Sequence, residues 1–304
     1  TDGRPNDPAT EIRRIGDIQR ELQELRSQNT QLHNEAALKQ QMLKERMAET
    51  RRKRAENKAK REQERLDRAT AWATQKQTEI VFLGEGVSGG LNHQASNLER
   101  LQQNNLPILH NAVDLAAALD ITVNQLRFLA FNRRTSTISH YVRFNISKKT
   151  GGVRRISAPM PHLKKVQQWV LDSILEKVAL HQSAHGFRRG RSIVTNAQPH
   201  VGAEILINLD FKDFFPSISY PRVKGLFRAL GYSEAVATLL GLLCTEPEVE
   251  EVTLDGKTYF VATTERHLPQ GAPSSPAITN VLCRRLDRRL SQMATELGFV
   301  YTRY

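Results

Sequence analysis

The strongest constraint on the fold is the stretch from residue 11 to about residue 80, which is almost free of glycine and proline. Glutamate, glutamine, arginine, lysine and alanine dominate it, and these residues favour helix. Its first half places residues at alternating three- and four-residue steps, namely Ile15, Ile18, Leu22, Leu25, Asn29, Leu32 and Ala36. These steps form a heptad seam, so the sequence predicts a long helix that begins as a short coiled coil.

The seam fades further along the helix, where Lys39 and Arg46 occupy positions that a coiled coil fills with apolar residues. The run "RRKRAENKAKREQERLDR" is charged on every face. Such a run is either a solvated helical spacer or a basic arm for nucleic acid or a partner. We interpret residues 1–83 as an N-terminal helical coiled-coil extension. We expect it to join copies of the protein or to dock an effector protein, and expect catalysis not to need it.

Charge and cysteine content narrow the class of protein. Among 304 residues, lysine and arginine number 44 against 32 aspartates and glutamates, a formal net charge of +12. This surplus favours a nucleic-acid partner, although solvated basic faces also produce one. Cys244 and Cys283 are the only cysteines and have no metal-site spacing, which fits the cytoplasm. No membrane span or signal peptide is predicted.

Glycines in "FLGEGVSGGL" end the long helix near residue 84, and residues 94–133 return to helical patterns in which Asp120 and Thr122 mark a stop and a start. The next segment pairs "VRFNI" with "VRRISAP" across "SKKTGG", which predicts a β-hairpin with a basic tip. Further on, a second hairpin is expected around Asp255-Gly256, followed by one long helix in "AITNVLCRRLDRRLSQMATELG". Helices and strands mix without a βαβ period, so the predicted fold class is α+β.

Two carboxylates lie in the apolar run "NLDFKDFFPSIS", at Asp210 and Asp213. The preceding "AEILINL" predicts a buried strand that ends at Asp210. A carboxylate there loses hydration, which is costly unless a cation or hydrogen-bond donors compensate. The alternative interpretation makes Asp210 a helix N-cap.

A glycine- and proline-rich turn, "LPQGAPSSP" at 268–276, leads directly into a predicted helix. Backbone N–H groups at a helix N-terminus suit a phosphate or the sugar edge of a nucleotide, although such a sequence is often only a turn. The basic hairpin tip is suited to neutralise a triphosphate. In their order along the chain, a basic hairpin, a strand-end aspartate and a Gln-Gly loop before a helix, the three features indicate the nucleotide-handling half of a polymerase palm.

From "HYVRFNISKKTGG" to its end the chain resembles a reverse transcriptase, more narrowly the bacterial retron type. "INLDFKDFFPSI" is similar to the strand with the first catalytic aspartate, and "HLPQGAPSSPAITN" to the motif that contacts nucleotide and template. Residues 196–200 match the Asn-Ala-x-x-His signature of the retron group, and "GEGVSGGL" resembles a segment before the core. The resemblance implies right-hand polymerase fingers and a partial palm over 141–304, preceded by a helical pre-fingers segment over 84–140.

The same resemblance implies the site residues. Asp210 would bind both catalytic Mg²⁺ ions, with the Phe211 carbonyl as a further ligand to one. Phe215 would be a steric gate against a ribose 2′-OH, and Asp213 would place its backbone near the triphosphate. Holding two Mg²⁺ ions during phosphoryl transfer requires clustered carboxylates.

The nucleotide would also contact the loop and the hairpin. Gln270 and Gly271 would line its site, and Arg155 with either Lys148 or Lys149 would hold the base and phosphates.

The family function is that of an RNA-directed DNA polymerase. Retron enzymes copy a structured non-coding RNA into branched msDNA from dNTPs, priming from a guanosine 2′-OH, and act in anti-phage defence with a toxic effector. Asn196 and His200 would bind that RNA, unless they only make local capping hydrogen bonds. The alternatives are a group II intron-like or other bacterial reverse transcriptase, against which Asn196 and His200 argue, and a catalytically dead RNA-binding scaffold.

One departure from the family pattern concerns the second catalytic motif. In the family "YTRY" is followed by Ala-Asp-Asp, whereas this sequence ends at Tyr304. We therefore expect a fragment of a longer protein that, as given, does not polymerise.

Overall fold

The computed structural model describes residues 8–148 and 151–304. Lys149, one of the two candidate triphosphate lysines, lies outside the described residues. The chain divides into two compact units, Thr1–Trp72 and Ala73–Tyr304. The described part of the first unit is helix, whereas the second unit combines helices with two small sheets, as the α+β prediction requires.

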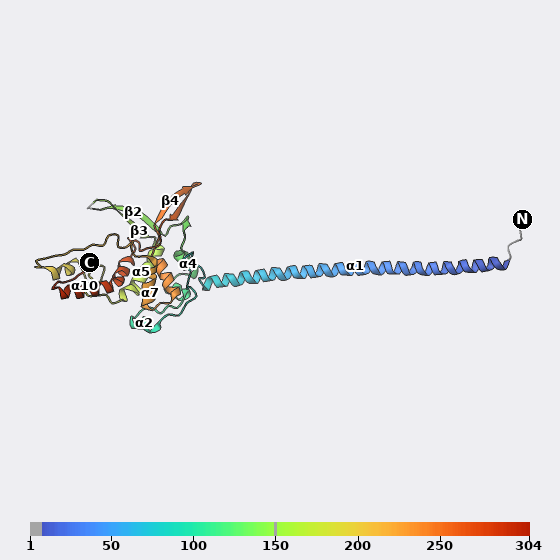
Figure 1. The fold of residues 1–304 in the computed structure, drawn as a ribbon, viewed down its shortest axis with the longest axis horizontal. Coiled ribbons are helices and arrows are strands. Elements are labelled where there is room, and N and C mark those ends of the chain that lie inside the picture. Colours follow the sequence, from blue (N-terminus) through green and yellow to red (C-terminus); the bar gives the residue numbers. More distant parts are fainter. Residues whose placement is uncertain (1–7, 149–150) are drawn as a thin grey trace. The chain divides into compact units, whose positions relative to one another are not determined.

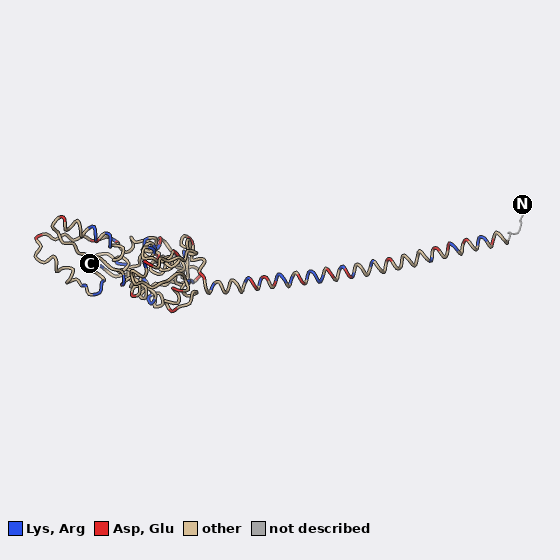
Figure 2. The backbone as a smooth tube through the Cα atoms, turned by 90° about the horizontal axis from the view of Figure 1, so that it is seen from below, with Lys and Arg blue, Asp and Glu red and all other residues tan. Residues whose placement is uncertain are grey.

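The long helix is α1, which runs from Pro8 to Thr78 and confirms the predicted helical stretch (Figure 1). None of its described residues is buried. Its ion pairs are surface contacts within the helix, such as Lys53 with Glu49 at 2.8 Å. Figure 2 shows basic and acidic residues alternating along it. The seam residues are therefore exposed, and coiled-coil pairing stays a prediction.

Short helices follow, namely α2 (Leu98–Gln103), α3 (Ala112–Ala118) and α4 (Val123–Ala130). The predicted stop at Asp120 and start at Thr122 agree with the end of α3 and the start of α4. Asp120 adopts a left-handed conformation after α3 (φ +56°), and Thr122 caps α4 reciprocally with Gln125. Gly84 has φ +111°, and a side chain there would collide with the Asn132 carbonyl. Glycine is thus required where the segment folds back on the end of α4.

Two antiparallel hairpins confirm the predicted pairs of strands. β2 (Tyr141–Ser147) pairs with β3 (Val153–Pro159), and β4 (Val249–Leu254) pairs with β5 (Lys257–Ala262). Asp255 and Gly256 turn the second hairpin with positive φ at both positions, as a two-residue turn requires. β1 (Thr135–Ser136) adds to β5, and Figure 1 shows both hairpins on the same side of the unit.

The core of the second unit is helical. It contains α5 (Pro161–Ser173), the 3₁₀ turn η1 (Leu175–Lys177), α7 (Tyr220–Leu230) and α8 (Glu234–Leu243). Every residue of α8 after Glu234 is buried, as expected for a helix that is apolar on all sides. Gly231 ends α7 in the left-handed conformation, with φ +114°. The helices α5, α7 and α8 thus form the buried core of this unit, and α5 packs against strand β3 of the first hairpin.

The last part of the chain forms α9 (Ser275–Leu282) and α10 (Arg284–Glu296). The prediction of one continuous helix here is wrong at Cys283, which ends α9 and precedes α10 with a backbone ψ of −4°. The short elements α6 (Ile193–Ala197) and η2 (Gln198–His200) precede the Asp210 region.

None of the helices in the described part of the chain is long and apolar enough to cross a membrane.

The prediction of a buried strand before Asp210 is wrong. Residues 204–210 form no strand and are exposed, with Ile205 at 65% and Leu209 at 84% exposure. A strand needs the backbone groups of a neighbour, but the described strands pair among themselves, in the orders β1-β5-β4 and β2-β3. The apolar side chains of this run favour burial, but the pattern does not specify a neighbouring strand with which the segment would pair.

Candidate active site

The loop with Gln270 and Gly271 packs directly on the basic hairpin. The Ser157 amide of β3 donates to the Gln270 carbonyl at 2.8 Å. Gly271 has φ +125°, and a Cβ there would lie 2.8 Å from Ile156 Cγ2 and 3.0 Å from the Ser157 carbonyl oxygen. Only glycine permits this approach of loop to strand. The structure thus joins two of the three predicted parts of the nucleotide site.

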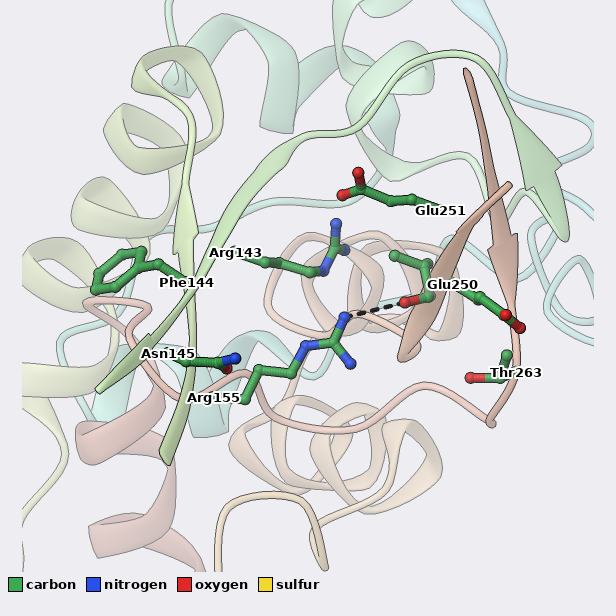
Figure 3. A pocket seen from close by; sticks show the side chains of 8 residues that line it. Arg143, Phe144, Asn145, Arg155, Glu250, Glu251 and Thr263 are labelled. Atoms are coloured by element: carbon green, nitrogen blue, oxygen red, sulfur yellow. Dashed lines mark hydrogen bonds between the residues drawn. The ribbon is translucent and has the colours of Figure 1, made fainter. Parts of the chain in front are cut away.

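Arg155 points from β3 toward the second hairpin. It lies opposite Asn145 in the register, and its Nη2 donates to the Val249 carbonyl at 3.0 Å. The two hairpins enclose a pocket of about 490 Å³, with basic and amide side chains on one wall and Glu250 and Glu251 on the other (Figure 3). Arg155 therefore faces a cavity with charges of both signs.

Lys148 lies at the described edge of the hairpin tip. Its amide donates to the Gly152 carbonyl at 3.0 Å, and this bond links the two strand ends at the tip. Arg154, the other tip arginine, lies opposite Ile146 in the register. Because successive side chains of a strand alternate in direction, Arg154 and Arg155 point to opposite faces, and only Arg155 lines the pocket.

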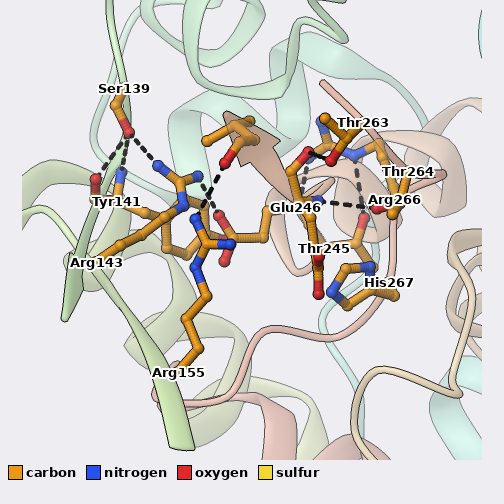
Figure 4. A network of polar contacts seen from close by, with 12 residues as sticks. Ser139, Tyr141, Arg143, Arg155, Thr245, Glu246, Thr263, Thr264, Arg266 and His267 are labelled. Carbon is orange, nitrogen blue, oxygen red and sulfur yellow. Dashed lines mark hydrogen bonds and ion pairs between the residues drawn. The ribbon is translucent and has the colours of Figure 1, made fainter. Parts of the chain in front are cut away.

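A buried polar network fixes the base of this pocket (Figure 4). Arg143 of β2 pairs with Glu246 at 2.7 Å, with side-chain exposures of 10% and 6%. Arg266 donates to the Leu242 carbonyl at 2.7 Å and also to the Thr245 carbonyl. Burial lowers the pKa of the Arg266 guanidinium. The network ties the basic hairpin to the end of α8 and to the strand-like segment before Gln270.

Sequence reasoning missed the Arg143–Glu246 pair. Arg143 alternates with the apolar residues of "VRFNI", which places it on the opposite face of the strand, but nothing in the sequence indicates Glu246 as its partner. Burial and the nearby Glu246 charge raise the pKa of Tyr141, so its hydroxyl stays protonated. That hydroxyl accepts from Gln167 Nε2 at 3.0 Å.

The residues that follow Asp210 make packing and hydrogen-bond contacts, whereas Asp210 itself is exposed. Phe211 and Phe214 stack with ring centroids 5.5 Å apart, and Phe215 packs partly buried against the core. Asp213 has φ +49°, a conformation uncommon for residues other than glycine. The Ser217 amide donates to its carbonyl at 3.1 Å, which closes the turn. Neither a buried strand end nor an N-cap role of Asp210 is present in this arrangement.

Backbone pairing links this turn to the Gln270 loop. The Leu268 amide donates to the Ile218 carbonyl at 3.0 Å, and the Tyr220 amide donates to the Arg266 carbonyl at 2.8 Å. Residues 218–220 therefore run beside residues 266–268, where the Gln270 loop starts. The candidate gate Phe215 lies three residues before Ile218 in the sequence.

Asn196 and His200 contact the end of the described chain. His200 Nε2 lies 2.7 Å from Thr302 Oγ1, and that hydroxyl donates to the Asn196 carbonyl at 3.3 Å. The Asn196 side-chain oxygen is buried and has no hydrogen-bond partner among the described residues. The local N-cap of α6 is Ser192 rather than either residue. The His200 side chain and the Asn196 backbone carbonyl thus contact a distant segment, and the helix cap is made by Ser192.

The segment 301–304 is anchored by a buried aspartate that sequence reasoning did not select. Asp287 of α10 is fully buried and accepts Arg303 Nε at 2.7 Å and Nη2 at 2.9 Å. Tyr301 Oη donates to the same carboxylate at 3.0 Å, and Arg303 Nη1 donates to Asn280 Oδ1 at 2.8 Å. The available signal was a lone acid among arginines in "RRLDRRL".

The charge state of this cluster is fixed by its contacts. Burial acts to lower the pKa of Arg303, but the hydrogen bonds and charge of Asp287 outweigh it and raise the pKa. Burial, with the Asp287 charge, raises the pKa of Tyr301. The backbone of Arg303 also bonds Ser183 and His185, both at 2.7 Å. The last described residues are therefore held from both sides by a charged cluster.

The described residues do not assemble the expected magnesium site. Within 8–148 and 151–304, no group of three or more His, Cys, Asp or Glu side chains is arranged to hold a metal ion. Asp210 is exposed, and a two-metal centre requires several convergent carboxylates. Asp210 and the Phe211 carbonyl are thus insufficient for that centre.

The family match covers most of the part of the chain that carries this geometry, from the end of β2 onward. The family model described as reverse transcriptase (RNA-dependent DNA polymerase) matches residues 146–304, slightly more than half of the chain. The matched region includes the Gln270 loop, the Asp210 segment and the anchored end. The chain belongs to the reverse transcriptase family.

The similar curated proteins are retron enzymes, which confirms the retron-type resemblance. Retron Mx162 reverse transcriptase of Myxococcus xanthus is 47% identical over 77% of this chain and 49% of its own length. Retron Mx65 reverse transcriptase of the same organism is 44% identical over 67% of the chain and 48% of its length. Retron Ec86 reverse transcriptase of Escherichia coli is 35% identical over 68% and 59%. The chain spans about half the length of the two Myxococcus relatives.

Proposed function

We propose that this chain is the fingers and partial palm of a retron RNA-directed DNA polymerase. The contact between the Gln270–Gly271 loop and β3 is the observation that carries the proposal, because it joins two elements with suitable nucleotide-binding groups. The retron relatives support the same class. The proposed reaction copies a structured non-coding RNA into branched msDNA from dNTPs.

The proposed residue roles follow the loop–hairpin contact. Gln270 and Gly271 line the nucleotide, while Arg155 and Lys148 lie on the hairpin where phosphates are neutralised. Phe215 is the proposed gate against a ribose 2′-OH, since its ring is partly buried beside the segment that leads to the loop. Positive charge at the hairpin favours the polyanionic substrate.

Asp210 is the proposed magnesium ligand, with the Phe211 carbonyl as a second donor and the Asp213 backbone near the triphosphate. The exposed side chain of Asp210 is free to bind a cation, but it needs further carboxylates to do so at a two-metal centre. When bound, Mg²⁺ would stabilise the negative charge of phosphoryl transfer. The chain's own contribution is to fix the turn after Asp210 through Phe215 and Ser217.

Asn196 and His200 are proposed to serve the cognate RNA through the segment that they hold. His200 bonds Thr302, so a change at His200 disturbs residues 301–304 as well as any RNA contact. The proposed biological setting is anti-phage defence in the cytoplasm, with the extension joining copies or docking an effector protein. The extension is exposed along its described length, which suits an association element.

The test is to isolate the full-length gene product with the nucleic acid that it carries and to sequence and digest that nucleic acid. The proposal predicts a DNA strand complementary to one structured RNA and joined to it by a 2′,5′ branch, which a debranching enzyme cleaves. A product made only of RNA would overturn the polymerase assignment. Linear DNA copied from unrelated RNAs would support another bacterial reverse transcriptase.

A further inference from the structure

The first half of α1 exposes a row of large apolar side chains on one helix face. Their exposures are Ile15 55%, Ile18 52%, Leu22 45%, Leu25 59% and Leu32 65%. Nothing within the described part of this unit covers them, because α1 has no buried residue. Exposed apolar rows of this kind mark association surfaces.

The spacing of the row fixes which residues share each heptad position. With Ile15 at the first position a, positions a and d hold Ile15, Ile18, Leu22, Leu25, Asn29, Leu32 and Ala36. The next d position is Lys39, where two copies would bring like charges together. The apolar seam is therefore limited to residues 15–36, which is enough for a weak pair of helices.

We propose that this seam binds a second copy of the same chain as a parallel, in-register coiled-coil dimer. Asn29 is the first argument, because it occupies an a position in the middle of the seam. In a parallel in-register pair each Asn29 faces the other, and their amides hydrogen-bond across the interface. In an antiparallel pair Asn29 packs against apolar d residues and loses that partner.

Charge complementarity is the second argument. Glu21 lies at position g and Arg26 at position e, flanking the seam. Five residues apart, they do not meet within one helix, where neighbours are three or four residues apart. In a parallel dimer, however, position g of one chain faces position e of the next heptad on the other. Glu21 of each copy then pairs with Arg26 of the other, so the dimer contains this contact twice.

The remaining flanking pairs are compatible with the same arrangement. Position g meets position e in the pairs Arg14 with Gln19, Gln28 with His33, and Glu35 with Gln40. None of these pairs opposes like charges. The inference deepens the proposed role of the extension as an association element and rests on that role, while it is independent of the polymerase assignment.

Cysteine cross-linking of the whole chain tests whether the seam is the interface between the two copies. Leu25→Cys places a thiol on the seam, and Ser27→Cys, at position f, places one on the far face as the matched control. We expect Leu25→Cys to form a covalent dimer under mild oxidation and Ser27→Cys to stay monomeric on a non-reducing gel. The native Cys244 and Cys283 are buried. Equal cross-linking of both variants, or of neither, would overturn the proposal.

A charge-reversal cycle tests the partner and the register together. Glu21→Lys or Arg26→Glu alone should weaken dimerisation on the order of tenfold, since attraction becomes repulsion at two sites. The double variant should restore it, which an antiparallel dimer or an effector-binding face would not do. Sedimentation without RNA or nucleotide measures this separately from DNA synthesis. A double variant as weak as the single ones would contradict the parallel dimer.

Discussion

Two segments of the proposed site differ sharply in how they are held. The loop at 268–276 is fixed by a backbone hydrogen bond to β3, by the close approach of Gly271 and by the helix that follows. The segment at 204–210 has no strand partner and exposes its apolar side chains. A sequence motif can therefore indicate which chemistry its residues suit without containing the contacts that hold those residues in place.

The largest expected effect concerns the cluster that anchors residues 301–304. Asp287→Ala leaves the Arg303 guanidinium partly buried without its carboxylate, which should cost about 3–5 kcal/mol of folding free energy. Urea unfolding of the chain measures this. The control is Asp172→Ala, which removes surface contacts to Arg189 and Gln168 and should cost less than about 1 kcal/mol. Equal losses would show that the cluster does not stabilise the fold.

Core packing gives a slightly smaller expected effect. Leu243 is fully buried in α8, whereas Leu209 is 84% exposed. Leu243→Ala should cost about 2–5 kcal/mol, and Leu209→Ala should stay within about 0.5 kcal/mol. Both are measured by urea unfolding of the same chain. A large loss at Leu209 would mean that the 204–210 segment is packed in solution, which removes the contrast between the two segments.

The close packing of the Gln270 loop is tested at Gly271. Gly271→Ala adds a Cβ against Ile156 and the Ser157 carbonyl and also strains a positive φ, so we expect a loss of about 1–3 kcal/mol. Gly202→Ala is the matched control, because its φ is +82° but no atom lies within 4 Å of the added Cβ. Thermal unfolding should rank Gly271→Ala below Gly202→Ala. The reverse order would show that the loop contact is looser than described.

The smallest expected effect is a pH dependence at His140, which contacts the Phe128 carbonyl of α4. Burial lowers the pKa of His140, opposed by its bond to the Phe128 carbonyl and reinforced by the positive Arg133 and Arg266. Because the unfolded His140 binds a proton more readily than the folded one, its contribution to stability is lost as pH falls below about 6.5. Wild type should lose more stability between pH 7.5 and 5.5 than His140→Gln does. Identical profiles would remove His140 as a source of this dependence.

Local signals predicted most of the fold. The helix stop at Asp120, the helix start at Thr122 and the hairpin around Asp255-Gly256 depend on residues close in sequence, and all three are present. The strand before Asp210 depends on distant pairing, so its apolar pattern alone was insufficient. Similarly, nothing local predicts that Asp287 meets Arg303 across 16 residues.

In the candidate site, too, features with a local cause could be predicted from the sequence, whereas contacts between distant segments could not. The Gln270 loop was recognisable because a glycine-rich turn before a helix has a local cause, and the structure adds its contact with β3. His200 was selected through the Asn-Ala-x-x-His signature, but its bond to Thr302 links segments 102 residues apart. The sequence therefore indicates which residues are candidates for the site, but not which distant residues they contact.

The most direct test of the catalytic assignment replaces Asp210 in the full-length gene product. Asp210→Ala should abolish Mg²⁺-dependent DNA synthesis on the cognate RNA and change RNA affinity by less than about twofold, because phosphate contacts supply most of that affinity. Glu204→Ala, an exposed acid on the same segment, is the control and should synthesise DNA normally. Near-normal DNA yield from Asp210→Ala would contradict the assignment.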